Sequence, residues 1–172
     1  MRVAVGVVVL MFGLATVAQA EDAPDRAFWT DQFKGRTVDL SRLTDLDGNP
    51  FDLSAQGGSV LIHFWATWCG PCLEEMPKLI AMAKEMNSKI EIVAVSEDKG
   101  GADQVKPFLA RHSELNSIKI LLDQSRKGAK SLTVSVLPTT ILVKNGIELD
   151  RVVGSAPWEK DDVRHLGDDI GN

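Results

Sequence analysis

Two cysteines separated by two residues are the feature of this sequence with the clearest chemistry. They stand in the run Trp68-Cys69-Gly70-Pro71-Cys72, and the chain has no other cysteine. An apolar stretch of strand length precedes the run and a helix-like pattern follows it, which places both thiols at the start of a helix. The backbone N–H groups of the first helical turn have no hydrogen-bond partner within the helix. Together with the positive end of the helix dipole, they favour the thiolate form of a cysteine there. Cys69 is therefore the expected nucleophile, and Cys72 the thiol that resolves the mixed disulfide.

Two other interpretations of a Cys-x-x-Cys pair compete with redox chemistry. In the first, the pair is half of a zinc site. Such a site would need a second pair of ligands, and the chain has no further cysteine and no paired histidines. An inert structural disulfide is the other alternative, but closing so short a loop stabilises a protein little through chain entropy. The position of the pair between a strand and a helix, in a secreted chain, favours the redox interpretation.

The start of the chain has the layout of a secretory signal peptide. Residues 1–20 place Arg2 before an apolar run that ends in Ala18-Gln19-Ala20, a small-residue cleavage site. An uncleaved membrane anchor is the alternative, because the apolar run approaches the length of a minimal membrane span. Cleavage would place the mature protein in the periplasm, an oxidising compartment in which disulfides persist.

Composition indicates one globular domain after this segment. The 172 residues are 44% hydrophobic and 25% charged, which is too apolar for a disordered chain. The formal net charge of −5 argues against the basic face that nucleic-acid binding requires. We expect an N-terminal extension over residues 21–36 and a single domain over residues 37–172.

Strand-like and helix-like patterns alternate along that domain. Pro107 is expected near the start of the helix at 105–112, where a missing backbone N–H is tolerated. Strands alternating with helices imply right-handed crossovers and a parallel sheet core, with an antiparallel hairpin at one edge. The sequence thus predicts an α/β fold with a mixed sheet between helices. The expected elements are a hairpin in 38–53 around Asp47-Gly48, strands at 60–65, 90–96 and 118–122, helices at 69–87, 105–112, 125–131 and 158–169, and a hairpin in 139–153 around Asn145-Gly146.

Several motifs resemble the thioredoxin fold. These are HFWATWCGPC, the proline Pro77 eight residues after Cys69, and Leu137-Pro138-Thr139 before a strand. The segment DLDGNPFDLSAQGGSVLIHFWATWCGPCLEEMPKL is similar to the exported TlpA/ResA/CcmG (DsbE) branch of thiol-disulfide oxidoreductases. The resemblance covers residues 38–166 and implies a thioredoxin-like fold, with a central mixed β-sheet flanked by helices and an additional N-terminal β-hairpin.

The resemblance also implies roles for individual residues. Cys69 matches the family's nucleophilic cysteine and Cys72 the resolving one, so that the two form a redox-active disulfide. Pro138 matches the cis-proline opposite that disulfide, where the backbone of Leu137 pairs with an incoming peptide in strand fashion. Substrate contacts are expected from six positions, Trp68, Gly70, Pro71, Leu137, Pro138 and Thr139.

Two further residues are candidates for proton transfer near the cysteines. Glu75 matches an acidic residue of this branch and shares a helix face with Cys72, so its carboxylate would raise thiol pKa values or shuttle a proton. An exposed surface glutamate is the alternative. His63 departs from the family, which usually has Asp or Asn at this position. A neutral imidazole there would accept the Cys72 proton, and a hydrogen-bonded core histidine is the competing interpretation.

Together these observations predict a periplasmic thiol-disulfide oxidoreductase that works mainly as a disulfide reductase. The resemblance implies protein disulfides as substrates, such as apocytochrome c in cytochrome c maturation or copper-centre assembly proteins. It also implies a membrane electron donor of the DsbD type. We expect no cofactor, no metal, no nucleic-acid partner and a monomer.

Two alternative functions remain at this stage. One is a general periplasmic disulfide reductant. The other, from a different class, is a copper-binding chaperone resembling the Sco proteins. Those proteins space their cysteines by three and carry a distal histidine motif, whereas the spacing here is two. An oxidase of the DsbA kind is disfavoured because the chain has no long helical insertion between its strands.

Overall fold

The computed structural model describes residues 29–86, 90–158 and 166. The predicted signal peptide over residues 1–20 lies outside the described residues. So do the first eight residues of the predicted extension, 21–28, and most of the predicted last helix, 158–169.

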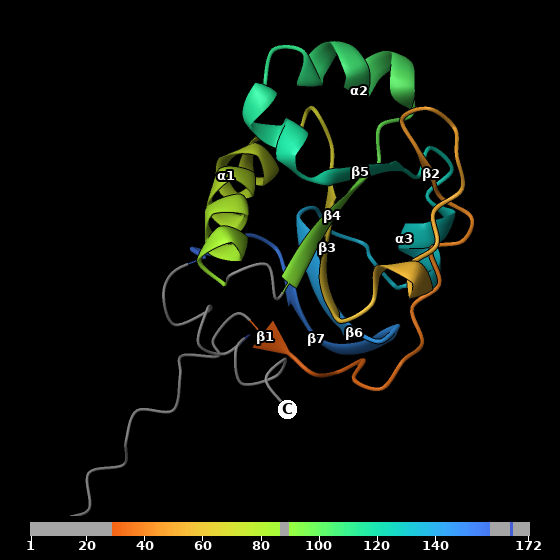
Figure 1. Cartoon of the computed structure of the whole chain (residues 1–172), viewed down its shortest axis with the longest axis vertical. Helices are drawn as coiled ribbons and strands as arrows, with labels where there is room; N and C mark the ends of the chain where they lie inside the picture. The colour runs from red at the N-terminus through yellow and green to blue at the C-terminus, as the bar shows by residue number, and fades with distance from the viewer. Residues whose placement is uncertain (1–28, 87–89, 159–165, 167–172) are drawn as a thin grey trace, which may run out of the picture.

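A single mixed sheet forms the centre of the molecule (Figure 1). Its strand order is β1-β7-β6-β3-β4-β5-β2. The central strand β3 pairs in parallel with β4 and antiparallel with β6, which confirms the predicted parallel core with an antiparallel edge. The strands are β1 (Trp29–Thr30), β2 (Thr44–Asp45), β3 (Ser59–Trp65), β4 (Ile90–Ser96), β5 (Lys119–Leu122), β6 (Thr139–Lys144) and β7 (Ile147–Val153).

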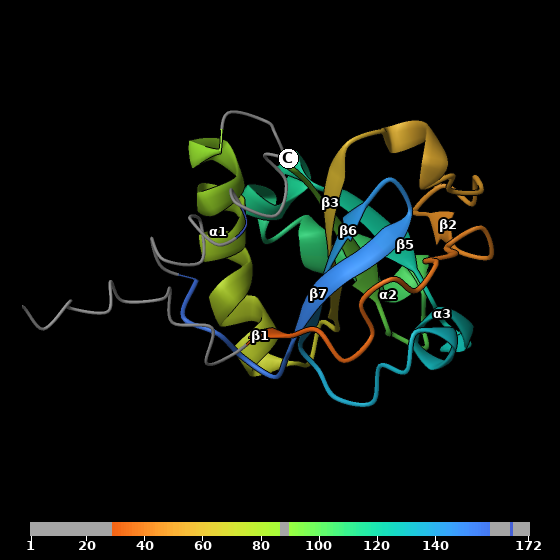
Figure 2. The same ribbon diagram turned by 90° about the horizontal axis from the view of Figure 1, so that it is seen from below.

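Helices cover the two faces of this sheet. They are α1 (Gly70–Glu85), α2 (Ala102–Leu109) and α3 (Lys127–Ser131), with short 3₁₀ turns at Ser54–Gln56 and Ser113–Ser117. Figures 1 and 2 show α1 and α3 on opposite sides of the sheet. This arrangement confirms the prediction of a mixed sheet between helical layers.

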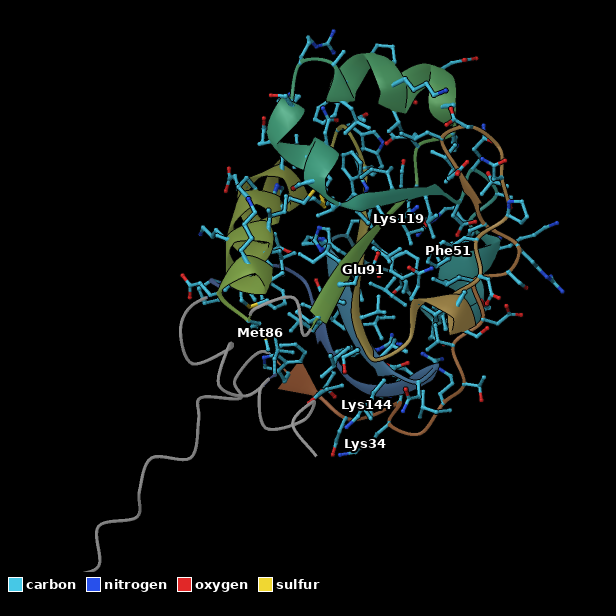
Figure 3. All side chains as sticks on the ribbon, viewed as in Figure 1. Lys34, Phe51, Met86, Glu91, Lys119 and Lys144 are labelled. Carbon is cyan, nitrogen blue, oxygen red and sulfur yellow. A yellow bond between two sulfur atoms is a disulfide. The ribbon has the colours of Figure 1, made fainter. Side chains whose placement is uncertain are left out.

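The alternation of side chains along β3 divides the core in two. All seven residues of β3 are buried, as the apolar run predicts for a strand covered on both faces. Leu61 packs with Met76 of α1 in one core, and Ile62 packs with Leu132 in the other. Phe51, labelled in Figure 3, belongs to the second core. Residues at odd positions of β3 therefore face α1, the helix that carries the cysteines.

The predicted hairpin over residues 38–53 is not confirmed. A tight turn is present, in which the Asp45 N–H donates to the Asn49 carbonyl, but Thr44 and Pro50 form only one isolated bridge. Pro50 has no N–H with which to extend a ladder. The short strand β2 pairs instead with β5, at the edge of the main sheet.

The position of Pro107 within its helix was also predicted wrongly. Helix α2 begins at Ala102, so Pro107 is its sixth residue rather than one of its first. Proline there removes one hydrogen bond to the carbonyl of Asp103, four residues earlier. Asp103 is exposed, and water is available to that carbonyl. The hairpin at Asn145-Gly146 is confirmed, with both turn residues at positive φ.

Candidate functional site

The two cysteines form a disulfide at the start of α1. Cys69 is the N-cap residue of the helix and Cys72 lies in its first turn, with their Cα atoms 5.3 Å apart. The Cys69 carbonyl accepts the first helical hydrogen bond, from the Leu73 N–H at 3.2 Å. Gly70 and Pro71 fill the first helical positions, where the missing N–H of a proline removes no hydrogen bond of the helix. The fold therefore places the Cys69 sulfur at the positive end of the α1 dipole.

The two sulfur-bearing residues differ in access. Cys72 is fully buried, while Cys69 retains 6% exposure and lines a surface groove of about 780 Å³. Trp68 stands at the rim of this groove with 69% exposure. Cys69 is thus the cysteine that a partner can reach. The groove is lined by Trp68, Cys69, Gly70, Pro71, Glu97, Lys99, Gln104, Arg126, Ser135 and Leu137.

The segment before β6 forms another part of the groove. Leu137 lines it, and the Leu137–Pro138 peptide bond is cis, as the resemblance implies. Thr139 begins β6 and pairs with Phe64 of β3, and its hydroxyl donates to the Val136 carbonyl at 2.8 Å. The structure therefore brings the predicted residues at 68–71 and at 137 to one groove, while Pro138 and Thr139 lie buried beside it.

Asp98 holds the loop that joins β3 to α1. Its carboxylate is fully buried and accepts hydrogen bonds from the Thr67 N–H at 2.9 Å and the Thr67 hydroxyl at 2.8 Å. It also accepts from the Ser96 hydroxyl and from the Gln104 amide. One carboxylate thereby ties the loop that precedes Cys69 to the end of β4 and to α2.

His63 of β3 and Glu75 of α1 lie next to each other in the interior of the protein. His63 lies at the centre of β3, on the face that packs against α1. Its Nδ1 is 2.9 Å from the Thr140 hydroxyl oxygen and 3.7 Å from Glu75 Oε1. Glu75 Oε2 accepts the Ala156 N–H at 3.1 Å. Both side chains are buried, so Glu75 is not the exposed surface glutamate that the sequence left open.

Burial sets the charge states of this pair. It lowers the pKa of His63 to about 3 and raises the pKa of Glu75 to about 7, while the Ala156 N–H opposes the rise. At neutral pH the imidazole is therefore neutral and the carboxyl is close to half protonated. The 3.7 Å contact is accordingly one between a carboxyl group and a neutral imidazole rather than an ion pair.

Sequence reasoning missed the far wall of the groove. Glu97 is only 4% exposed, and its carboxylate contacts the guanidinium of Arg126. Burial raises the pKa of Glu97 to about 7, and the nearby Asp123 adds to the rise, while Arg126 opposes it. Both residues follow the carboxyl ends of adjacent parallel strands, where ligand sites of α/β sheets gather, and that signal was available in the sequence. Asp98 likewise follows the carboxyl end of a parallel strand, β4.

Among the described residues, His, Cys, Asp and Glu side chains do not gather in groups of three or more that could hold a metal ion. Within the same ranges, no helix has the length and apolar character needed to span a bilayer.

Comparisons with known proteins agree with this geometry. Residues 17–170 match the family model described as Redoxin. The chain is 33% identical to the thiol-disulfide oxidoreductase ResA of Geobacillus kaustophilus, over 77% of this chain and 75% of that protein. It is 28% identical to ResA of Bacillus cereus, over 78% and 80%. A crystal structure described as a thiol:disulfide interchange protein DsbE from Chlorobium tepidum superposes with a TM-score of 0.67 and 26% identity, over 81% of this chain and 98% of that one.

Proposed function

Because the chain belongs to the Redoxin family and is a thioredoxin-like thiol-disulfide oxidoreductase, we propose that it acts mainly as a reductase of disulfides in partner proteins. The observation that carries the proposal is the asymmetry of the Cys69–Cys72 pair. One cysteine lines a groove at a helix N-terminus and the other is buried one turn further on.

The reaction proceeds in two exchanges. The Cys69 thiolate attacks one sulfur of the partner's disulfide, the S–S bond breaks, and a partner thiolate leaves and takes up a proton. Cys72, as its thiolate, then attacks the Cys69 sulfur of the mixed disulfide. The second partner thiol is released and the Cys69–Cys72 disulfide forms. Two electrons pass from the protein to the partner.

The second exchange needs a proton acceptor inside the protein, because Cys72 is fully buried. Glu75 lies three residues further along the same helix face, and burial brings its pKa to about 7. We assign it the role of taking the Cys72 proton, since a carboxyl near half protonation accepts and returns protons efficiently. His63, 3.7 Å away and neutral, is assigned to position the Glu75 carboxyl.

The groove supplies the contacts for the partner. Trp68 lines it as a large exposed apolar side chain, and Val136, which lies between the lining residues Ser135 and Leu137, is exposed as well. Exposed apolar side chains at a site are typical of protein docking surfaces. We propose that the backbone of Leu137 pairs with the partner chain there, with Gly70, Pro71, Pro138 and Thr139 shaping the surface.

The cellular setting of this reaction is part of the proposal. The composition of residues 1–20 supports cleavage of a signal peptide and a periplasmic protein that begins with a short extension before a domain at 37–172. We propose apocytochrome c or copper-centre assembly proteins as partners, a DsbD-type membrane donor as the source of electrons, and a monomeric protein. A general periplasmic reductant is the second candidate within this class.

Trapping experiments test the proposal directly. Pre-reduced wild-type protein is expected to reduce insulin disulfides, while Cys69→Ser abolishes the reaction. Cys72→Ser, expressed with its own signal segment, is expected to accumulate mixed disulfides that mass spectrometry identifies. The captured partners distinguish a dedicated client from general reduction. Turnover that survives Cys69→Ser would overturn the mechanism.

A further inference from the structure

The wall of the groove opposite the cysteines carries positive charge that the reaction itself does not use. Lys99 follows β4 and Arg126 follows β5, and both line the groove that contains Cys69. The chain as a whole has a formal net charge of −5, whereas the groove is lined by these two cations and one carboxylate, Glu97, so its formal charge is +1. A local charge of opposite sign beside a reactive group indicates selection of partners by charge.

Both cations have N–H groups without a hydrogen-bond partner among the described residues. Arg126 uses Nε to contact Glu97, and no hydrogen bond from Nη1 or Nη2 is found among the described residues. Across the same ranges, Lys99 Nζ has no hydrogen-bond or ion-pair partner, and only the Lys99 carbonyl is engaged, by the Gln124 amide. The remaining Nη1 and Nη2 N–H groups of the guanidinium suit the two oxygens of a carboxylate.

Two other carboxylates near these cations accept hydrogen bonds from the protein. Asp98 accepts hydrogen bonds from Thr67, Ser96 and Gln104. Asp123 accepts the Ala129 N–H at the start of α3. Burial raises the pKa of the neighbouring Glu97 carboxyl, and Asp123 raises it further. Glu97 is the one acidic residue that lines the groove, against two cations that do so. Glu97 Oε1 is buried without a hydrogen-bond partner among the described residues. The same carboxylate contacts Arg126 through Nε, which leaves Nη1 and Nη2 of Arg126 for a ligand.

The backbone at Arg126 supports the same interpretation. Its φ is +55°, in the left-handed region that non-glycine residues rarely adopt. Such positions cluster at sites where a side chain must be held in place. Arg126 lies four residues after the end of β5, at the N-cap position of α3, and its guanidinium contacts Glu97 at the groove.

We propose that Arg126 and Lys99 make the groove select disulfide partners that carry a carboxylate side chain beside the attacked cysteine. The inference rests on the proposed reductase function and specifies its substrate class, an acidic disulfide-bearing polypeptide. The cysteine sulfur meets Cys69, the apolar part of the partner contacts Trp68, and the carboxylate lies between Lys99 and Arg126. A groove of about 780 Å³ holds several residues of an extended peptide.

Peptide disulfides test this selection without any added reductant. Pre-reduced wild-type protein is mixed in single-turnover reactions with three peptides that share one internal disulfide. The peptides carry Glu, Gln or Lys at one position, scanned over the three residues on either side of the attacked cysteine. The Glu peptide is expected to react about three- to tenfold faster than the Gln peptide, and the Lys peptide slowest. In 0.5 M NaCl the preference is expected to shrink toward unity.

Charge-neutral variants locate the preference on the groove. Arg126→Gln and Lys99→Gln are each expected to lower the Glu-to-Gln rate ratio, and Arg126→Lys to restore part of it. Lys127→Gln removes the same charge from the adjacent exposed residue, which does not line the groove, and is expected to keep the wild-type ratio. Urea unfolding checks that each variant is folded.

The outcomes separate the two proposals. Equal rates for the three peptides at every scanned position would overturn the charge selection and leave disulfide reduction intact. Loss of the preference in Lys127→Gln to the same degree as in Arg126→Gln would also overturn it, because net charge would then be the cause. Failure of wild-type protein to reduce any of the peptides would instead count against the reductase function.

Discussion

Glu75 shows how burial changes the protonation of a single side chain. Removing its carboxyl from water makes the ionised form costly, and one backbone N–H from Ala156 compensates only in part. The result is a group that titrates near neutral pH on the same helix face as a buried thiol. Helical spacing identifies this residue in the sequence, but its burial depends on the β7–Ala156 segment, which lies 81 residues away.

Replacing Glu75 by Gln is expected to slow the resolving exchange by about 10- to 100-fold, because an amide cannot take the Cys72 proton. The first exchange, at Cys69, is expected to change much less, so the mixed disulfide accumulates. Stopped-flow mixing with a peptide disulfide, followed by acid quench and mass spectrometry, separates the two steps. Glu74→Gln removes the same charge from the exposed neighbouring residue and serves as the control. An unchanged rate of resolution in Glu75→Gln would remove Glu75 from the proton path.

Asp98, which follows β4, holds the loop that connects β3 to α1. Asp98 accepts four hydrogen bonds from donors in three segments, at residues 67, 96 and 104. Spacing along the sequence does not reveal these partners, because they meet only through the parallel pairing of β3 with β4. The elements themselves were largely predictable, since buried strands are apolar runs and the Asn145-Gly146 turn dictates a hairpin.

Asp98→Ala is expected to lower the free energy of unfolding by about 2–4 kcal/mol, because it leaves buried donors of Thr67 and Ser96 without acceptors. The loss of loop order at residues 66–68 is expected to lower kcat/KM for disulfide reduction as well. Urea unfolding and insulin reduction measure the two effects. Asp103→Ala, at an exposed position of α2, is the matched control. If both variants behave alike, Asp98 does not organise the loop.

Two local features differ from what the sequence patterns predict. The hairpin at 38–53 is not confirmed, because Thr44 and Pro50 form a single bridge while β2 pairs with β5. Helix α2 begins at Ala102, three residues before the predicted start at 105, so Pro107 lies inside it. Glu97 and Arg126 each follow a strand in the sequence, but 29 residues separate them, and their contact depends on β4 and β5 being neighbours in the sheet.

Across the whole molecule, buried ionisable groups give the stability two opposing pH dependences. His63 has a pKa lowered from 6.5 to about 3, so its contribution is present above pH 6.5 and is lost as the pH falls. Glu75 and Glu97 have pKa values raised from 4.5 to about 7, so their contributions are present below pH 4.5 and are lost as the pH rises through 7. The fold is therefore weakened on both sides of an intermediate pH.

Glu75→Gln isolates one of these contributions, because glutamine does not ionise. The variant is expected to gain stability relative to wild type between pH 5 and pH 8, by on the order of 2–3 kcal/mol, since the wild-type carboxyl must ionise in a buried site. Urea unfolding of the oxidised proteins at several pH values measures this difference. A stability difference that stays constant from pH 5 to pH 8 would contradict the raised pKa of Glu75.

The shortness of β1 and β2 has a consequence for how the protein meets other chains. Each outer strand has two residues, and residues 35–38 add backbone hydrogen bonds along β7. Among the described residues, the two outermost strands therefore present only short rows of free N–H and C=O groups that could serve as a template for aggregation. The backbone pairing proposed above for Leu137 would instead bring a partner chain into the groove that also contains Cys69.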